Sequence, residues 1–161
     1  MYITYSDYAA LYDAPDMTTF QRLSYQACRI LDRHTTGVDG VKKLKVAFPT
    51  DQDATDAVKH CAAHIVNFLH QIMEAEKSAS MARGYTETGM GLQGKVVSSI
   101  TAGNESVSFT TASAQKTAAD VAITDLSFRN NQIRAIIREY LSGVTDANGV
   151  NLLYMGVYPR V

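Results

Sequence analysis

The sequence predicts a mainly α-helical protein: a helical bundle with one long projecting helix and an inserted β-hairpin arm. Apolar residues recur at three- and four-residue spacing through most of the 161 residues, which indicates amphipathic helices around one core. Between residues 84 and 112 this pattern stops, and glycine, serine and threonine predominate. The length suits a single domain spanning 1–161, and nothing in the composition requires a second.

Two helices are predicted in the first part of the chain. Ser6 can cap a short helix that runs to about Tyr12. Thr18 or Thr19 caps a second helix, which Gly37 ends. Apolar residues at helical spacing form the inner face of the second helix: Phe20, Leu23, Ala27, Ile30 and Leu31.

The longest helix is predicted to follow Pro49. A short helical piece over 41–48 ends at this proline, and Thr50 or Asp51 then caps the long helix. If the long helix continues to Arg83, its rise per residue makes it roughly 50 Å long, whereas a compact globule of this chain length is about 40 Å across. We therefore expect its far end to overhang its own core. Its inner face comprises Ala54, Val58, Cys61, Ile65, Phe68 or Leu69, and Ile72.

Residues 84–112 predict one β-hairpin. The segments 95–101 and 106–110 alternate, and Gly103-Asn104 between them tolerates the positive φ of a tight turn. Burying its apolar side chains stabilises the hairpin by roughly 1.5 to 3 kcal/mol each. Ordering about 20 residues costs on the order of 20 to 40 kcal/mol of backbone entropy, which is more than this burial offsets. This arm is therefore either disordered or ordered against a partner. We expect a subunit interface at Val96, Ile100, Val107 and Phe109.

A helical pattern resumes after residue 112 and continues to Ser142-Gly143, with a break near 128–131. The tail, residues 144–161, is too apolar and aromatic for a solvated terminus. It should dock on its own domain or on a partner. The apolar helical positions before it are Val121, Ile123, Leu126, Ile133, Ile136, Ile137, Tyr140 and Leu141.

The charge distribution disfavours several classes of function. The net charge is −1, with acidic and basic residues interleaved, so no strong attraction to nucleic acid or anionic membrane is expected. The N-terminus lacks the layout of a signal peptide, and no long apolar run is present. The sequence therefore predicts a soluble protein made in a cytosol. Cys28 and Cys61 face inward on predicted helices as small apolar groups.

Motifs for catalysis or cofactors are weak. His60 and His64 are spaced as metal ligands, but Cys61 replaces the glutamate of a zinc protease motif and no third ligand is evident, which favours a solvated or interfacial histidine face. The segment 89–94 has the letters of a dinucleotide-binding loop, yet a helix precedes it and a strand follows. It is better explained as a flexible approach to the hairpin. We expect no enzyme activity, no metal and no cofactor.

Tyrosines cluster at both ends of the chain, as in contact surfaces that are half wet. Equally, Tyr5, Tyr8 and Tyr12 simply cover the first helix. Stacking platforms for single-stranded nucleic acid would need basic residues among the N-terminal tyrosines, and none precedes Arg22.

Several short segments carry a family resemblance. They are Tyr2-Ile3-Thr4 with Tyr8, Asp32 with Thr35-Thr36-Gly37, Lys43-Leu44-Lys45 before Ala47-Phe48-Pro49, and then 94–99, 138–143 and 148–157. In this order and spacing the chain resembles, over nearly its whole length, the head-tail connector (head completion or adaptor) proteins of tailed bacteriophages and their prophages.

The resemblance implies a homo-oligomeric ring of roughly a dozen copies. Such a ring sits beneath the portal protein at the head-tail interface of the virion, after assembly in the bacterial cytoplasm, and presents a surface to a tail-side completion or stopper protein. DNA passes through its channel without specific binding, no membrane is involved, and no catalysis is implied. Docking on the portal or a neighbour falls to Leu153, Tyr154, Met155 and Tyr158.

The alternative hypothesis is a small DNA-binding or packaging accessory protein. Such a protein would bind duplex DNA with a steep dependence on salt.

Overall fold

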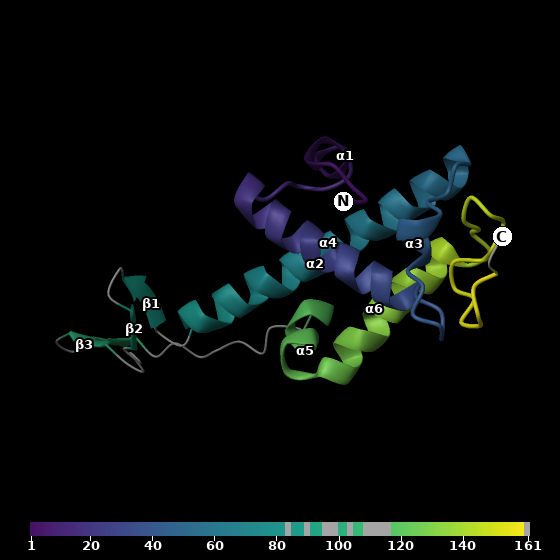
Figure 1. The fold of residues 1–161 in the computed structure, drawn as a ribbon. Helices are drawn as coiled ribbons and strands as arrows, with labels where there is room; N and C mark the ends of the chain where they lie inside the picture. Colours follow the sequence, from purple (N-terminus) through teal and green to yellow (C-terminus); the bar gives the residue numbers. More distant parts are fainter. Residues whose placement is uncertain (83–84, 89–90, 95–99, 103–104, 108–116, 160–161) are drawn as a thin grey trace. The chain divides into compact units, whose positions relative to one another are not determined.

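The structure is a computed structural model that describes residues 1–82, 85–88, 91–94, 100–102, 105–107 and 117–159. The protein is mainly helical, with six helices in these residues (Figure 1), and this confirms the helical class that the sequence predicts. The chain forms two compact units. One contains Met1–His70 and Ser127–Val161, and the other contains Gln71–Leu126.

The first helix, α1 (Tyr5–Ala9), begins two residues earlier than a cap at Ser6 predicts. Its cap is Thr4, because Asp7 completes a reciprocal capping box: the Asp7 N–H donates to Thr4 Oγ1 at 3.2 Å, and the Thr4 N–H donates back to the Asp7 carboxylate at 3.3 Å. The prediction of Ser6 as cap was wrong. Behind this turn, Tyr8 is buried against the ring of Phe20.

The second helix, α2 (Met17–His34), is capped by Asp16, whose carboxylate accepts the Thr19 N–H at 3.0 Å. Neither Thr18 nor Thr19 is the cap, since a carboxylate is already placed to accept this N–H. The helix ends before Gly37. Four of the five predicted inner residues are buried, and Ile30 is half-buried.

A short helix, α3 (Lys43–Val46), precedes the long helix α4 (Gln52–Ala82). Asp51 accepts the Ala54 N–H at 3.0 Å, which confirms it as a cap. The 31 residues of α4 span about 46 Å. Its buried positions include Val58, Cys61, Ile65, Phe68, Leu69 and Ile72, whereas no side chain from 73 to 80 is buried. The predicted overhang of this end stays a prediction.

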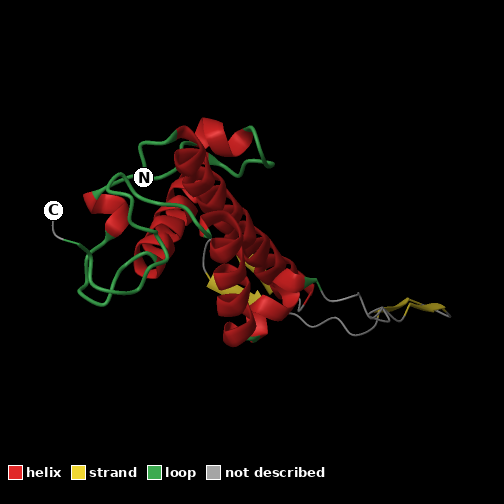
Figure 2. Ribbon diagram, turned by 90° about the vertical axis from the view of Figure 1, so that its right-hand side faces the viewer, coloured by secondary structure: helices red, strands yellow, loops and turns green. Residues whose placement is uncertain are grey.

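The described strands form two short antiparallel pairs (Figure 2). The first joins β1 (Tyr85–Thr88) to β2 (Gly91–Gly94), a pair that the sequence did not predict because its residues lack an apolar alternation. The second joins β3 (Ile100–Ala102) to β4 (Glu105–Val107), with Ile100 opposite Val107. Val96 and Phe109 lie outside the described residues. The hairpin as one arm stays a prediction.

Two helices follow, α5 (Ala118–Thr124) and α6 (Leu126–Leu141). The break between them lies at Asp125, where φ is −116° and ψ is 98°, and not at 128–131 as predicted. Aspartate favours the position before a helix, whereas the residues at 128–131 continue the α6 ladder. At the far end Gly143 adopts a φ of 81°, which ends α6 as predicted.

Candidate functional site

The segment after α6, residues 144–159, is folded back on itself. An isolated antiparallel bridge joins Thr145 to Asn151. Within this turn the Asp146 carboxylate accepts the N–H groups of Asn148 and Val150, both at 2.9 Å, and Gly149 has a φ of 75°. The tail is therefore a built loop and not a solvated terminus (Figure 1).

A buried lysine fixes this segment to α3 within the first unit. Lys43 of α3 is fully buried, and its ammonium donates to the backbone carbonyls of Asn151 and Leu152, both at 3.1 Å, and to that of Tyr154. Three carbonyls match the three donors of an ammonium group. Nζ also lies 5.6 Å from the centre of the Tyr154 ring.

Burial lowers the pKa of Lys43, and the nearby carboxylates of Asp146 and Asp39 oppose that shift. The carbonyl cage and these carboxylates offset the cost of placing the ammonium in the interior. An interior charge held this way binds its partners strongly, because losing any one of them leaves a buried group unpaired.

Tyr158 forms a second anchor at the end of the described segment. It is buried, and its hydroxyl donates to the Asp146 carboxylate at 2.7 Å and accepts from the Asn148 amide at 2.9 Å. Its backbone N–H donates to the carboxylate of Asp39 at 2.7 Å. Burial, followed by the hydrogen bond to Asp146, raises the pKa of Tyr158. The segment is thus held at both ends.

Between these anchors the segment exposes apolar side chains. Tyr154, Met155 and Val157 are 51%, 55% and 66% exposed, and Val38 is 74% exposed. The Val38 N–H donates to the Met155 carbonyl at 3.1 Å, so the loop before α3 adjoins the segment. We call these four residues the apolar C-terminal surface. Exposed apolar residues on a fixed backbone are typical of an interaction site.

Two glycines permit the close packing behind this surface. A Cβ at Gly156 would overlap the Tyr154 ring, and a Cβ at Gly37 would lie 2.7 Å from the Gly156 carbonyl oxygen. A larger residue at Gly37 would displace the backbone at Gly156, whereas one at Gly156 would displace the Tyr154 ring.

The predicted tail residues therefore differ in their surroundings. Tyr154 and Met155 are exposed, Leu153 is half-buried and Tyr158 is buried. Among the arm residues, Ile100 and Val107 are paired across β3 and β4, while Val96 and Phe109 lie outside the described residues. The partner contacts of all eight stay predictions. Lys43, Asp39 and Asp146 were not predicted as anchors, since no local pattern marks them.

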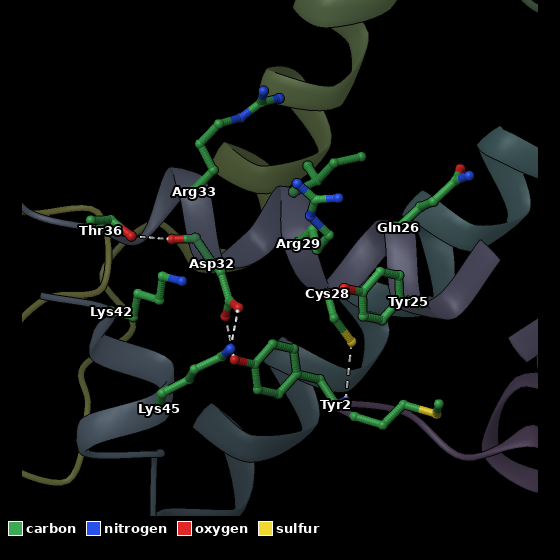
Figure 3. Close-up of a pocket in the computed structure, with 12 residues that line it drawn as sticks. Tyr2, Tyr25, Gln26, Cys28, Arg29, Asp32, Arg33, Thr36, Lys42 and Lys45 are labelled. Carbon is green, nitrogen blue, oxygen red and sulfur yellow. Dashed lines mark hydrogen bonds and ion pairs between the residues drawn. The ribbon is translucent and has the colours of Figure 1, made fainter. Parts of the chain in front are cut away.

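A basic pocket of about 980 Å³ lies along the second half of α2 (Figure 3). Four cationic side chains line it: Arg29, Arg33, Lys42 and Lys45. The carboxylate of Asp32 lies buried among them, where it accepts a hydrogen bond from the Tyr2 hydroxyl and pairs with Lys45 at 3.2 Å. Burial first, and then Asp32, raises the pKa of Tyr2.

The pocket brings aromatic and basic residues together, which their spacing in the sequence did not predict. Tyr2 and Tyr25 line it together with Arg29 and Arg33, although no basic residue precedes Arg22 in the sequence. The fold brings the N-terminus onto α2, where the Tyr2 N–H donates to Cys28 Sγ at 3.4 Å. Burial raises the pKa of this thiol.

The two histidines singled out by spacing have different surroundings. His60 is exposed, whereas His64 packs between the rings of Tyr12 and Tyr140, at centroid distances of 6.4 and 5.8 Å. Burial raises the pKa of Cys61 to about 12, so its thiol stays protonated. In the part of the chain that the structure describes, no three His, Cys, Asp or Glu side chains gather as metal ligands.

The same described residues include no helix that is long and apolar enough to cross a membrane. Comparison of the chain with protein-family models, with curated proteins and with solved structures finds no match.

Replacing Lys43 by methionine should destabilise the fold. The substitution keeps most of the side chain's length but removes the ammonium donor from the carbonyls of Leu152 and Tyr154, and leaves the Asn151 carbonyl with the Tyr154 N–H alone, so we expect a loss of about 3 kcal/mol in the free energy of unfolding. Denaturant unfolding measures it. Lys42→Met, at the exposed residue that immediately precedes the same helix, is the matched control and should cost less than about 1 kcal/mol. Equal losses in the two variants would contradict the anchoring role.

Tyr158 should make stability depend on alkaline pH. Because its pKa is raised in the folded state, the native protein keeps this proton where the unfolded chain has lost it. The contribution is full below a pH of about 10, the ordinary tyrosine pKa, and is lost as pH rises through the folded-state pKa. Stability should therefore fall less steeply above that pH in Tyr158→Phe than in the wild type.

Urea unfolding at a series of alkaline pH values measures these slopes. Tyr25→Phe, at an exposed tyrosine, is the control and should follow the wild type. A wild-type slope in Tyr158→Phe would show that the bond to Asp146 is not linked to folding.

Proposed function

We propose that the protein is a structural subunit of a tailed-phage virion, and that it forms a ring beneath the portal that joins head to tail and extends the DNA channel. The observation that carries this proposal is the apolar C-terminal surface, held by Lys43 and Tyr158. Three of its four residues, Tyr154, Met155 and Val157, lie in the segment 148–157, one of those that carry the resemblance to head-tail connectors.

The surface suits stable docking because it is ordered before any partner arrives. A preorganised segment loses little conformational entropy on binding, so more of its contact energy becomes affinity. Tyrosine and methionine are also enriched at the centres of protein interfaces. We assign Tyr154, Met155, Val157 and Val38 to the contact with the portal, and Tyr158 to holding them in place.

The second element of the proposal is an assembly arm at residues 84–112. Pairing of Ile100 with Val107 supports the hairpin that the sequence predicts over 95–110. A two-stranded hairpin is marginal in water by itself, and a neighbouring copy in a ring would supply the missing contacts. The interface residues proposed are Val96, Ile100, Val107 and Phe109. Imaged rings should show this arm against the adjacent subunit.

The proposed role includes no catalysis. For DNA to pass through the channel, the attraction between the protein and the DNA phosphates must be weak. A net charge of −1 suits a channel of this kind, because cations that neutralise phosphates release counterions and hold the duplex.

A DNA-binding or packaging accessory role is the second candidate. The basic pocket favours it, since Arg29, Arg33, Lys42 and Lys45 lie together near exposed tyrosine. That role predicts duplex binding that falls steeply with salt and is lost when these cations are removed. Failure to bind duplex at low salt would exclude it.

Charge placed on the apolar C-terminal surface should abolish docking. We expect the variant Met155→Asp with Val157→Asp to fold normally, because both side chains are exposed, and to bind portal-containing heads at least tenfold more weakly. Electron microscopy of heads incubated with subunit measures occupancy of the vertex. Val46→Asp, at a residue of α3 that is 63% exposed and outside the surface, is the matched control.

Normal occupancy by the doubly charged variant would contradict the assignment of the surface. Absence of the wild-type subunit from the vertex of portal-containing heads would reject the proposed function itself.

A further inference from the structure

The basic pocket holds more positive charge than the described residues of the chain neutralise. Among the described residues that line the pocket, Asp32 has the single carboxylate. This carboxylate already accepts a hydrogen bond from Tyr2 and forms an ion pair with Lys45. Figure 3 shows the head groups of Arg29 and Arg33 pointing away from Asp32, and neither they nor Lys42 pair with a carboxylate of the described residues. All three side chains are exposed. The pocket therefore presents three cations that an incoming acid could reach.

The charges of neighbouring elements strengthen this field. Burial lowers the pKa of His34, and the guanidinium groups of Arg33 and Arg134 lower it further. Arg134 belongs to α6, so a cation from a second helix lies close to the same end of α2. An anionic partner would relieve this repulsion between like charges.

The same chain carries an acidic surface that could serve as that partner. It comprises Asp51, Asp53 and Asp56 at the start of α4, with Asp7 of α1. Asp7 is close enough to Asp56 and Lys59 for their charges to act on its pKa. Lys59 pairs with Asp56 at 3.5 Å, which leaves the surface with four carboxylates against one ammonium. It shares no residue with the pocket.

We propose that the basic pocket receives the acidic surface of a second copy of this chain. Arginine pairs with carboxylates through two parallel hydrogen bonds, and the volume of about 980 Å³ admits several side chains of a partner. The exposed ring of Tyr25 adds apolar contact at the rim. Because pocket and acidic surface are different patches, the contact is head-to-tail, the kind that closes into a ring when its rotation allows.

Protein is the better occupant than nucleic acid for two reasons. The pocket is a concavity with a carboxylate in it, whereas a phosphate backbone is tracked by a continuous line of cations. The chain as a whole has a net charge of −1, so it repels phosphate outside this patch. The inference specifies which faces of the ring subunits meet, and it rests on the proposed function for the closure of that ring.

Charge reversal on each face, followed by restoration, tests the contact. The pocket variant is R29E with R33E, and the acidic-surface variant is D53K with D56K. Analytical ultracentrifugation at low salt measures self-association, with circular dichroism as the check on folding. We expect the wild type to associate and to dissociate as salt is raised, and each variant alone to associate at least tenfold more weakly.

Restoration is the decisive part of this experiment. In an equimolar mixture, and in one chain carrying all four substitutions, every pocket again faces opposite charge, so association should return to within about threefold of the wild type. R138E, at an exposed arginine outside both surfaces, is the matched control and should associate as the wild type does.

Three results would overturn the inference: a wild type that stays monomeric at low salt, variants that associate normally, or a loss that neither mixture nor combination restores. Salt-dependent DNA binding that R29E with R33E removes, without any change in association, would instead assign the pocket to nucleic acid. None of these results bears on the vertex of portal-containing heads, whose occupancy by the wild type tests the proposed function separately.

Discussion

The buried ammonium of Lys43 is the interaction on which the C-terminal segment, residues 144–159, depends. It gathers three carbonyls from residues 151–154 and so converts an apolar tail into a fixed loop. A charge in this position is costly unless every donor is used. The Lys43 ammonium meets that condition. Tyr158 is held in turn by Asp39, which accepts its backbone N–H, and by Asp146, which accepts its hydroxyl. Order in the tail thus follows from polar satisfaction more than from apolar burial.

As a consequence, the two sides of this short segment have different roles. Polar atoms and Tyr158 face the chain, while Tyr154, Met155 and Val157 face solvent. An apolar surface held in this way is costly for an isolated subunit, because it invites non-specific contact. The cost is understandable if the surface has a regular partner. The basic pocket and the acidic surface follow the same logic in charge: each carries an excess of one sign, and the contact proposed between copies would balance the two.

Periodicity predicted the helices well, because α2, α4 and α6 each bury one face. The helix caps were harder to predict. Thr4 and Asp16 are the caps in place of the neighbouring serine and threonine residues, because capping depends on side-chain geometry that sequence spacing does not show. The anchoring contacts could not be predicted from the sequence, because Lys43 and its carbonyl partners are 108 to 111 residues apart. The basic pocket likewise assembles residues from the N-terminus, α2 and α3. Local patterns predict elements, whereas sites formed by distant polar atoms need the fold.

The central claim is that the C-terminal segment is ordered in the free subunit, ready to dock. Native-state hydrogen exchange tests it most directly, through the amides of Val150, Leu152 and Tyr158, which donate to Asp146, Val144 and Asp39. These amides should exchange slowly, with opening free energies close to that of the α6 core. Exchange at the rate of an unstructured chain, in a subunit whose helices remain protected, would contradict the claim.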